Sequence, residues 1–337
     1  MAKAYVDDGQ VFSTCGHLVS LLQSTLTARY GRLSWNTSST QHVGSTITRY
    51  PNGAVSLDMS QAVSKALHNL GMDHVDGASS PSTPTFYYPS TDSTPTDPKP
   101  FQAVVGSLTY IARVRHDILM EVSHLQTLAS APTKGDLQKA IRVLRYLKAF
   151  PAFPAVYYTT GGAQLCAHVD ASFANRPDGA STSCLYLSIG PSSAPFLSKS
   201  YAQREDIAVC PASAEYFCLS MTTCKLIRRF RNLLAAIDFP QAGPTPIYSD
   251  NQPAIDLSKA RTIPRKSRYM SSAAHFIRGE VANGIVTLLK RDTNVHGADL
   301  GTKEHDPKTH HWLTKITLNH DAIPKSHTPA LAPVTVI

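Results

Sequence analysis

The chain has 337 residues, of which 42% are hydrophobic and 17% charged, a composition typical of a folded protein and not of a disordered one. No run approaches the roughly 20 apolar residues that a membrane-spanning helix needs, so we expect no membrane partner. The formal net charge of +8 favours a polyanionic partner such as nucleic acid.

Residues 1–75 predict a small α/β unit. A strand, a turn and a second strand are expected around residues 5–8, and leucines at helical spacing predict a helix over 17–30. The turn residues Pro51-Asn52-Gly53 stand between two short strand-like runs, which predicts a β-hairpin. A helix is expected over 60–69.

Residues 76–100 are rich in Ser, Thr and Pro. Proline removes a backbone donor and disfavours helix before it, so we expect a linker or a loosely draped loop. Residues 101–155 return to a helical pattern, with one apolar stripe formed by Ala140, Val143, Leu144 and Leu147. The basic side chains around that helix fit a solvated face and a nucleic-acid contact equally well; they are Lys139, Arg142, Arg145 and Lys148.

Residues 156–312 predict a second domain, and residues 313–337 a flexible tail. Short strands separated by Gly- and Pro-bearing turns come first, followed by a long helix that begins near Pro211. A strand over 245–250, two helices and a further strand follow. Three antiparallel strands, a helix and then alternating strands and helices predict an α/β sheet covered by helices.

Four carboxylates stand where strands end or helices begin, and side chains from distant segments can converge at such places. They are Asp170, Glu215, Asp250 and Asp299. Each acid alone has an ordinary structural explanation: Asp250 as a helix N-cap, Glu215 as a partner of the helix dipole, and the others as turn residues. All four in this order of elements favour a common site.

The chemistry that needs several carboxylates is metal-dependent hydrolysis. In-line cleavage of a phosphodiester requires a deprotonated water on one side and a stabilised leaving oxygen on the other. Two Mg²⁺ ions roughly 4 Å apart supply both, and such hard cations take oxygen ligands. We therefore expect the four acids to be metal-binding and catalytic, with Mn²⁺ as a substitute for Mg²⁺.

Eight motifs resemble, in order, the C-terminal part of the copia-type LTR retrotransposon Pol polyprotein. That part comprises the end of its reverse transcriptase, the connection helices and its ribonuclease H domain. The motifs are YVDD (5–8), VGSLTYIARVRHDI (105–118), KAIRVLRYLK (139–148), VDASFA (169–174), SAEY (213–216), YSDNQPAI (248–255), HFIRGEV (275–281) and ADLGTK (298–303).

The resemblance implies a ribonuclease-H-like mixed sheet with helices on both faces, preceded by a truncated palm and connection segment. It implies hydrolysis of the RNA strand of RNA–DNA hybrids. On this resemblance Asp170 bridges both metals, Glu215 and Asp250 complete the site nearest the leaving group, and Asp299 holds the metal that activates water. The family has a further acid two residues before its helical glutamate, where this chain has Ser213.

The resemblance also suggests partners. A basic segment before HFIR is expected to contact the hybrid backbone, although a solvated face is the alternative; it contains Lys259, Arg261, Arg265, Lys266 and Arg268. For His296 we consider a proton shuttle to the leaving group less favoured than a plain loop histidine.

The opening motif matches the metal-binding turn of a polymerase palm, formed by Tyr5, Val6, Asp7 and Asp8. In the family these aspartates share metals with another aspartate on an earlier strand, so we expect no polymerase activity from this chain alone. A separate chain carrying the palm and fingers is one conceivable partner. The main alternative to a nuclease is a truncated or domesticated remnant that binds nucleic acid without catalysis. No targeting run is evident, which leaves both cytoplasm and nucleus open.

Overall fold

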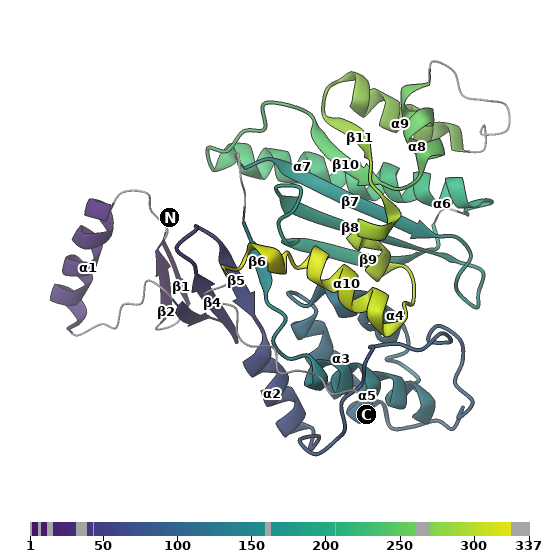
Figure 1. The fold of residues 1–337 in the computed structure, drawn as a ribbon, viewed down its shortest axis with the longest axis horizontal. Coiled ribbons are helices and arrows are strands. Elements are labelled where there is room, and N and C mark those ends of the chain that lie inside the picture. The colour runs from purple at the N-terminus through teal and green to yellow at the C-terminus, as the bar shows by residue number, and fades with distance from the viewer. Residues whose placement is uncertain are drawn as a thin grey trace.

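The computed structural model describes residues 2–5, 8–11, 16–31, 39–42, 44–158, 163–205, 207–260 and 270–324. Within these ranges the chain is a mixed α/β fold whose strands form three sheets (Figure 1). None of the helices in the described ranges is long and apolar enough to cross a membrane.

The N-terminal strands β1 (Ala2–Tyr5) and β2 (Asp8–Val11) form an antiparallel pair in which Tyr5 lies opposite Asp8. This confirms the strand pair expected around YVDD, while Val6 and Asp7 lie outside the described residues. Helix α1 (Gly16–Tyr30) follows close to its predicted bounds.

A second sheet contains β3 (Ser39–His42), β4 (Ser45–Arg49), β5 (Val55–Asp58) and β6 (Ala155–Tyr157), all antiparallel and in that order. Strands β4 and β5 form the predicted hairpin, and helix α2 (Ser60–Asn69) has the predicted bounds. The boundary expected between 155 and 156 is wrong, because β6 pairs with β5 and so belongs to the first unit.

The predicted helical segment contains α3 (Pro98–Ile111), the short helix η1 (His116–Ile118), α4 (Leu119–Thr127) and α5 (Lys134–Ala149). The apolar stripe expected on α5 is fully buried from Ala140 to Leu147. It packs in one core with residues of α2, α3 and α4.

The Ser/Thr/Pro-rich segment packs against α5, and Phe86 within it is fully buried in the helical core. Four of the five basic residues of α5 donate hydrogen bonds to this loop or to the residues just before it. The pairs are Lys139 to the Tyr88 carbonyl, Arg142 to Ser80 Oγ, Arg145 to the Asp76 carbonyl and Lys148 to the Val75 carbonyl. The linker expectation is therefore wrong, and the basic face is not a solvated one.

The main sheet has the order β11-β10-β7-β8-β9. Strands β7 (Leu165–Ser172), β8 (Ser181–Ile189) and β9 (Leu197–Gln203) are antiparallel, whereas β10 (Thr245–Ser249) and β11 (Val286–Lys290) run parallel to β7. Three antiparallel strands followed by parallel ones agree with the prediction from sequence.

Helices cover both faces of this sheet (Figure 1). Alternate residues of β7, including Leu165 and Val169, pack with α6 (Pro211–Phe217), the π-helical turn η2 (Cys218–Thr223), α7 (Cys224–Ala236), α8 (Gln252–Lys259) and α9 (Ser271–Ala282). On the other face, Cys184 and Tyr186 of β8 contact Ala298 and Leu119, which joins the sheet to the helical layer.

The chain then forms short helices η4 (Thr293–Val295) and η5 (Gly297–Gly301), helix α10 (Pro307–Thr317) and η6 (His320–Ala322). Leu318 is fully buried in the helical core and Ile323 is also buried. The prediction of a flexible tail from residue 313 is thus wrong for residues 313–324. Residues 325–337 lie outside the described ones.

Candidate metal centre

Strand register brings the first two acids together. Strand β10 runs parallel to β7 with Tyr248 beside His168. Residues two positions further along point to the same face of the sheet, so Asp250 follows the end of β10 next to Asp170. Asp170 is 1% exposed, whereas Asp250 is half-buried and accepts a 3.0 Å hydrogen bond from the Thr293 hydroxyl.

Glu215 reaches the site from the beginning of α6. Pro211 occupies the first turn, where its missing N–H costs nothing. The Ser213 hydroxyl oxygen accepts from the backbone N–H groups of Val209 and Cys210, each at 3.0 Å. At the position where the family has an acid, this chain therefore has a residue that fixes the helix start and so positions Glu215.

Asp299 lies in η5, which several contacts hold against the sheet. His296 is fully buried and its Nε2 lies 2.7 Å from the Val169 carbonyl; because a carbonyl only accepts, Nε2 carries the proton. A Cβ on Gly301 would overlap Cys184 Sγ, so a glycine is required where η5 contacts β8. His296 is thus a buried loop residue held in place by a backbone carbonyl, which agrees with the plain loop histidine favoured from the sequence.

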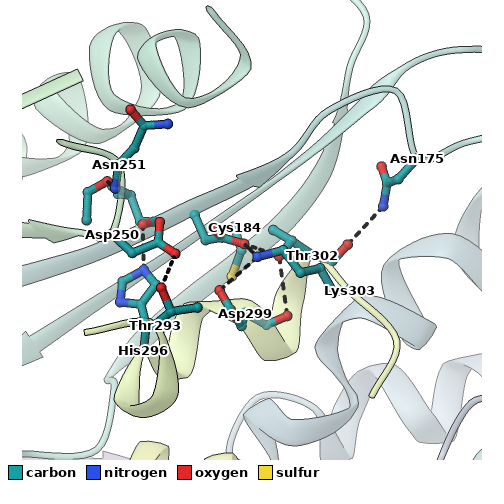
Figure 2. A network of polar contacts seen from close by, with 12 residues as sticks. Asn175, Cys184, Asp250, Asn251, Thr293, His296, Asp299, Thr302 and Lys303 are labelled. Carbon is teal, nitrogen blue, oxygen red and sulfur yellow. Dashed lines mark hydrogen bonds and ion pairs between the residues drawn. The ribbon is translucent and has the colours of Figure 1, made fainter. Parts of the chain in front are cut away.

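The four acids predicted from sequence meet in one place. Single ligand atoms of Asp170, Glu215 and Asp250 lie within 4.8 Å of one another, and so do those of Asp170, His296 and Asp299. Asp170 is common to both groups. Figure 2 shows Asp250 and His296 to the left of Asp299.

Two further side chains from the ADLGTK motif, the basic Lys303 and the hydroxyl-bearing Thr302, contact the acids of this cluster (Figure 2). The Lys303 ammonium lies 3.4 Å from Asp170 Oδ2 and 3.2 Å from Asp299 Oδ1. The Thr302 hydroxyl donates to Asp170 Oδ2, and the Thr302 carbonyl accepts from Asn175 Nδ2 at 2.9 Å. Sequence reasoning missed both side chains, although a lysine four positions after Asp299 could have been expected to reach it across one helical turn.

Burial and the charges of neighbouring groups give these acids different pKa values. Burial alone would raise the pKa of Asp170, but Lys303 and Thr302 hold this pKa below its ordinary value. Burial, Asp170 and Asp250 together raise the pKa of Glu215 well above its ordinary range. Burial and the neighbouring Asp170 raise the pKa of Asp299 to about 7.

The donor set fits hard divalent cations. Asp170 Oδ1 and Glu215 Oε2 are buried and have no hydrogen-bond partner within the described part of the chain. A buried carboxylate oxygen without a partner is costly unless it binds a cation. Carboxylate oxygens are the ligands that Mg²⁺ and Mn²⁺ prefer.

The basic segment expected to contact nucleic acid is only partly described. Lys259 ends α8 and is exposed, while Arg261, Arg265, Lys266 and Arg268 lie outside the described residues. Their role stays a prediction.

No protein-family model matches the chain. Curated relatives do match, and they include the retrovirus-related Pol polyproteins from transposons RE1 and RE2 of Arabidopsis thaliana. The first is 29% identical over 211 residues and the second 28% over 210. The Pol polyprotein from transposon TNT 1-94 of Nicotiana tabacum is 28% identical over 209 residues.

The curated relatives of this chain are Pol polyproteins of copia-type retrotransposons. The resemblance inferred from the motifs is thereby confirmed. The RE1 match covers 62% of this chain and 14% of the relative, the RE2 match 61% and 14%, and the TNT 1-94 match 60% and 15%. The chain therefore spans only a small part of these retrotransposon polyproteins.

Two solved structures are also similar in part. The foamy viral protease-reverse transcriptase in complex with dsDNA is 12% identical, with a TM-score of 0.25 over 87% of this chain and 55% of that one. The native protease-reverse transcriptase of prototype foamy virus is 11% identical, with a TM-score of 0.25 over 50% and 23%.

Proposed function

We propose that residues 165–303 form a ribonuclease-H-type nuclease that hydrolyses the RNA strand of RNA–DNA hybrids with divalent metal ions. The observation that carries this proposal is that ligand atoms of Asp170, Glu215 and Asp250 lie within 4.8 Å of one another, and that Asp170 belongs to a second such group with Asp299. A ribonuclease-H-like assignment also agrees with the strand order, three antiparallel strands followed by two parallel ones.

Each acid has a distinct place in this proposal. Asp170, shared by both ligand groups, would bridge two ions; Glu215 and Asp250 would complete one site and Asp299 the other. Divalent ions in such sites activate water and stabilise a leaving oxygen. Thr302 orients the Asp170 carboxylate, while η5, held by His296 and Gly301, fixes where Asp299 stands.

A nucleic-acid substrate suits the charge of the chain. The net charge of +8 favours binding to a polyanion, and Lys259, where the basic segment of the sequence begins, is exposed at the end of α8. A divalent-ion site made of carboxylates is consistent with hydrolysis of a phosphodiester in such a substrate.

One observation favours the alternative, a retrotransposon-derived chain that binds nucleic acid without cutting it. Lys303 forms ion pairs with both Asp170 and Asp299, so an internal cation already neutralises two of the four acids. If this ammonium is not displaced, an ion can use Glu215, Asp250 and the unpaired Oδ1 of Asp170, but not Asp299.

The two functions are separated by incubating a labelled RNA–DNA hybrid with the protein in Mg²⁺ or Mn²⁺, beside the variants Asp250→Asn and Asp256→Asn. Asp256 is an exposed acid on α8 whose side chain accepts a 2.7 Å hydrogen bond from Gln252, and it is the matched control. We expect Asp250→Asn to reduce cleavage at least about 100-fold, because a metal ligand is lost, and Asp256→Asn to cleave like the wild type. No cleavage by the wild type in either metal would favour the non-catalytic alternative.

A further inference from the structure

Helix α10 carries an exposed aromatic side chain next to the acid cluster. Trp312 lies in the middle of this helix and is 52% exposed. Its Nε1 donates a 3.0 Å hydrogen bond to the carbonyl of Asn294, the central residue of η4. This bond fixes the position of the indole and leaves about half of the side chain open to solvent. Neither the proposed cleavage nor the packing of α10 accounts for an exposed ring that is held in this way.

The indole lies at the rim of the candidate metal centre. Thr293, which precedes Asn294, donates to Asp250 Oδ2 at 3.0 Å (Figure 2). Asp250 is half-buried, and Thr293 and Asn294 are both exposed, so the cluster is open to solvent at this edge. A nucleic-acid strand that places a phosphodiester at the acids can therefore continue past Trp312.

Two lysines lie on the same face of α10 as the indole. Lys308 stands four residues before Trp312 and Lys315 three residues after it, and these spacings align side chains along one face of a helix. Lys308 is exposed and Lys315 is half-buried. The other side of the helix is buried, for example at Leu313 and Thr317. The exposed face of α10 is therefore formed by Lys308, Trp312 and Lys315.

The charges of this face favour an anionic partner. Neither Lys308 nor Lys315 forms an ion pair with a carboxylate in the described part of the chain. Helix α10 contains no acid, and the carboxylate of its N-cap Asp306 accepts from backbone N–H groups of the first turn. Lys315 also lines a cavity of about 310 Å³ in which Arg291 is a second cation and Asp321 the opposing acid. The face is thus complementary to a polyanion.

An exposed aromatic ring between two cations is suited to an unpaired nucleotide. Every nucleobase has a π face that can stack on an aromatic side chain, and cations alongside it attract the phosphates of the strand. Bases inside a paired duplex are already stacked on their neighbours, so an aromatic side chain stacks on bases that are unpaired. The exposed face of α10 therefore fits a single strand better than a duplex.

We propose that the exposed face of α10 binds a single-stranded extension of an RNA–DNA hybrid, with Trp312 stacking on an unpaired base and Lys308 and Lys315 attracting its phosphates. This inference rests on the proposed function, because the paired part of the same substrate would lie at the acids. It adds a substrate preference: a hybrid that continues into an unpaired segment binds more tightly than a blunt one.

The test measures the affinity of the whole chain for labelled hybrids in chelator, which keeps it independent of metal and cleavage. The hybrids are blunt or carry an unpaired extension at one end of one strand, and the possible placements are compared. Trp312→Phe and Trp312→Leu both remove the indole N–H, but only phenylalanine keeps a ring. The two variants thus separate stacking from the hydrogen bond to Asn294. Tyr88→Leu is the matched control, because Tyr88 is 51% exposed on the loop that packs against α5.

We expect at least one extension to raise the affinity of the wild type, Trp312→Phe and Tyr88→Leu by about tenfold, a factor typical of one stacked base. The same extension should raise the affinity of Trp312→Leu by less than about twofold. No gain from any extension in the wild type overturns the proposal. Equal gains, or equal losses of the gain, in Trp312→Phe and Trp312→Leu overturn it as well.

Fluorescence provides a second measurement that keeps Trp312 in place and so does not depend on how its variants fold. The chain has two tryptophans, Trp35 and Trp312, so Trp35→Phe leaves Trp312 as the only one. We expect the extended hybrid to quench the emission of this variant in chelator, and the blunt hybrid to leave it nearly unchanged. Equal emission with both hybrids overturns the proposal. Because no cleavage is involved, the outcome is separate from that of the Asp250→Asn test of the nuclease.

Discussion

The ammonium nitrogen of Lys303 lies 3.2 Å from the carboxylate of Asp299, one helical turn earlier in the chain. The same nitrogen lies 3.4 Å from Asp170. Both carboxylates raise the pKa of Lys303 further above its ordinary value, so this side chain is a cation throughout the physiological range. A divalent ion that binds these two carboxylates has to compete with it.

The first prediction follows from this competition. In Lys303→Met the apolar stem is kept and the charge removed, so we expect tighter binding of Mn²⁺, by about tenfold for a difference of about 1.4 kcal/mol. Titration calorimetry measures the affinity, and Lys308→Met, an exposed lysine on α10, is the control. Unchanged or weaker binding in Lys303→Met would mean that the lysine supports the metal site instead of competing for it.

The second prediction concerns the stability of the metal-free protein. The pKa of Asp299 is raised to about 7, mainly by burial and by Asp170. Between about pH 4, where an aspartate of the unfolded chain titrates, and about pH 7, the folded state holds a proton that the unfolded state has lost. This contribution to stability is present below about pH 4 and is lost as pH rises through about 7.

Comparison with Asp299→Asn isolates this contribution, because the amide has a similar shape and does not titrate. We expect the Tm of the wild type to fall by a few degrees relative to that of Asp299→Asn as pH rises from about 4 to about 7 in chelator. Saturating Mg²⁺ should reduce this decline, since a bound cation favours the ionised carboxylate. A constant difference between the two proteins across this range would contradict a raised pKa at Asp299.

The acids of the candidate site could be selected from sequence because their positions depend on strand ends and helix starts. Asp170 and Asp250 follow from a parallel strand pair, and Glu215 from a helix that begins with proline. Lys303 was not selected because its importance depends on which carboxylates surround it. That information comes from tertiary structure, although its spacing from Asp299 was visible.

The elements that sequence assigned wrongly are those defined by partners far away in the chain. Strand β6 has the pattern expected of a strand, but only its pairing with β5 shows which sheet contains it. Helix α10 begins with the N-cap Asp306 followed by Pro307, a recognisable start signal, and the buried Leu318 after it shows that this segment is not a tail.

The loop over 76–97 shows a further limit. Its Ser, Thr and Pro content is typical of a linker, and a linker would not bury an aromatic side chain. Phe86 is nevertheless fully buried between the helices, and Lys139 and Arg145 of α5 donate to carbonyl groups of the loop. Composition does not reveal donors that a neighbouring helix supplies.

The third prediction tests whether this loop is an integral part of the fold. Phe86 is buried whereas Tyr88, two residues later, is 51% exposed, so the two aromatic residues form a matched pair. We expect Phe86→Ala to lower the free energy of unfolding by about 3–5 kcal/mol, because it leaves a cavity in the core, and Tyr88→Ala to change it by less than about 1 kcal/mol. Urea unfolding followed by circular dichroism measures both values. If both substitutions had similar, small effects, residues 76–97 would behave as a linker, because a side chain in a linker does not contribute to the hydrophobic core.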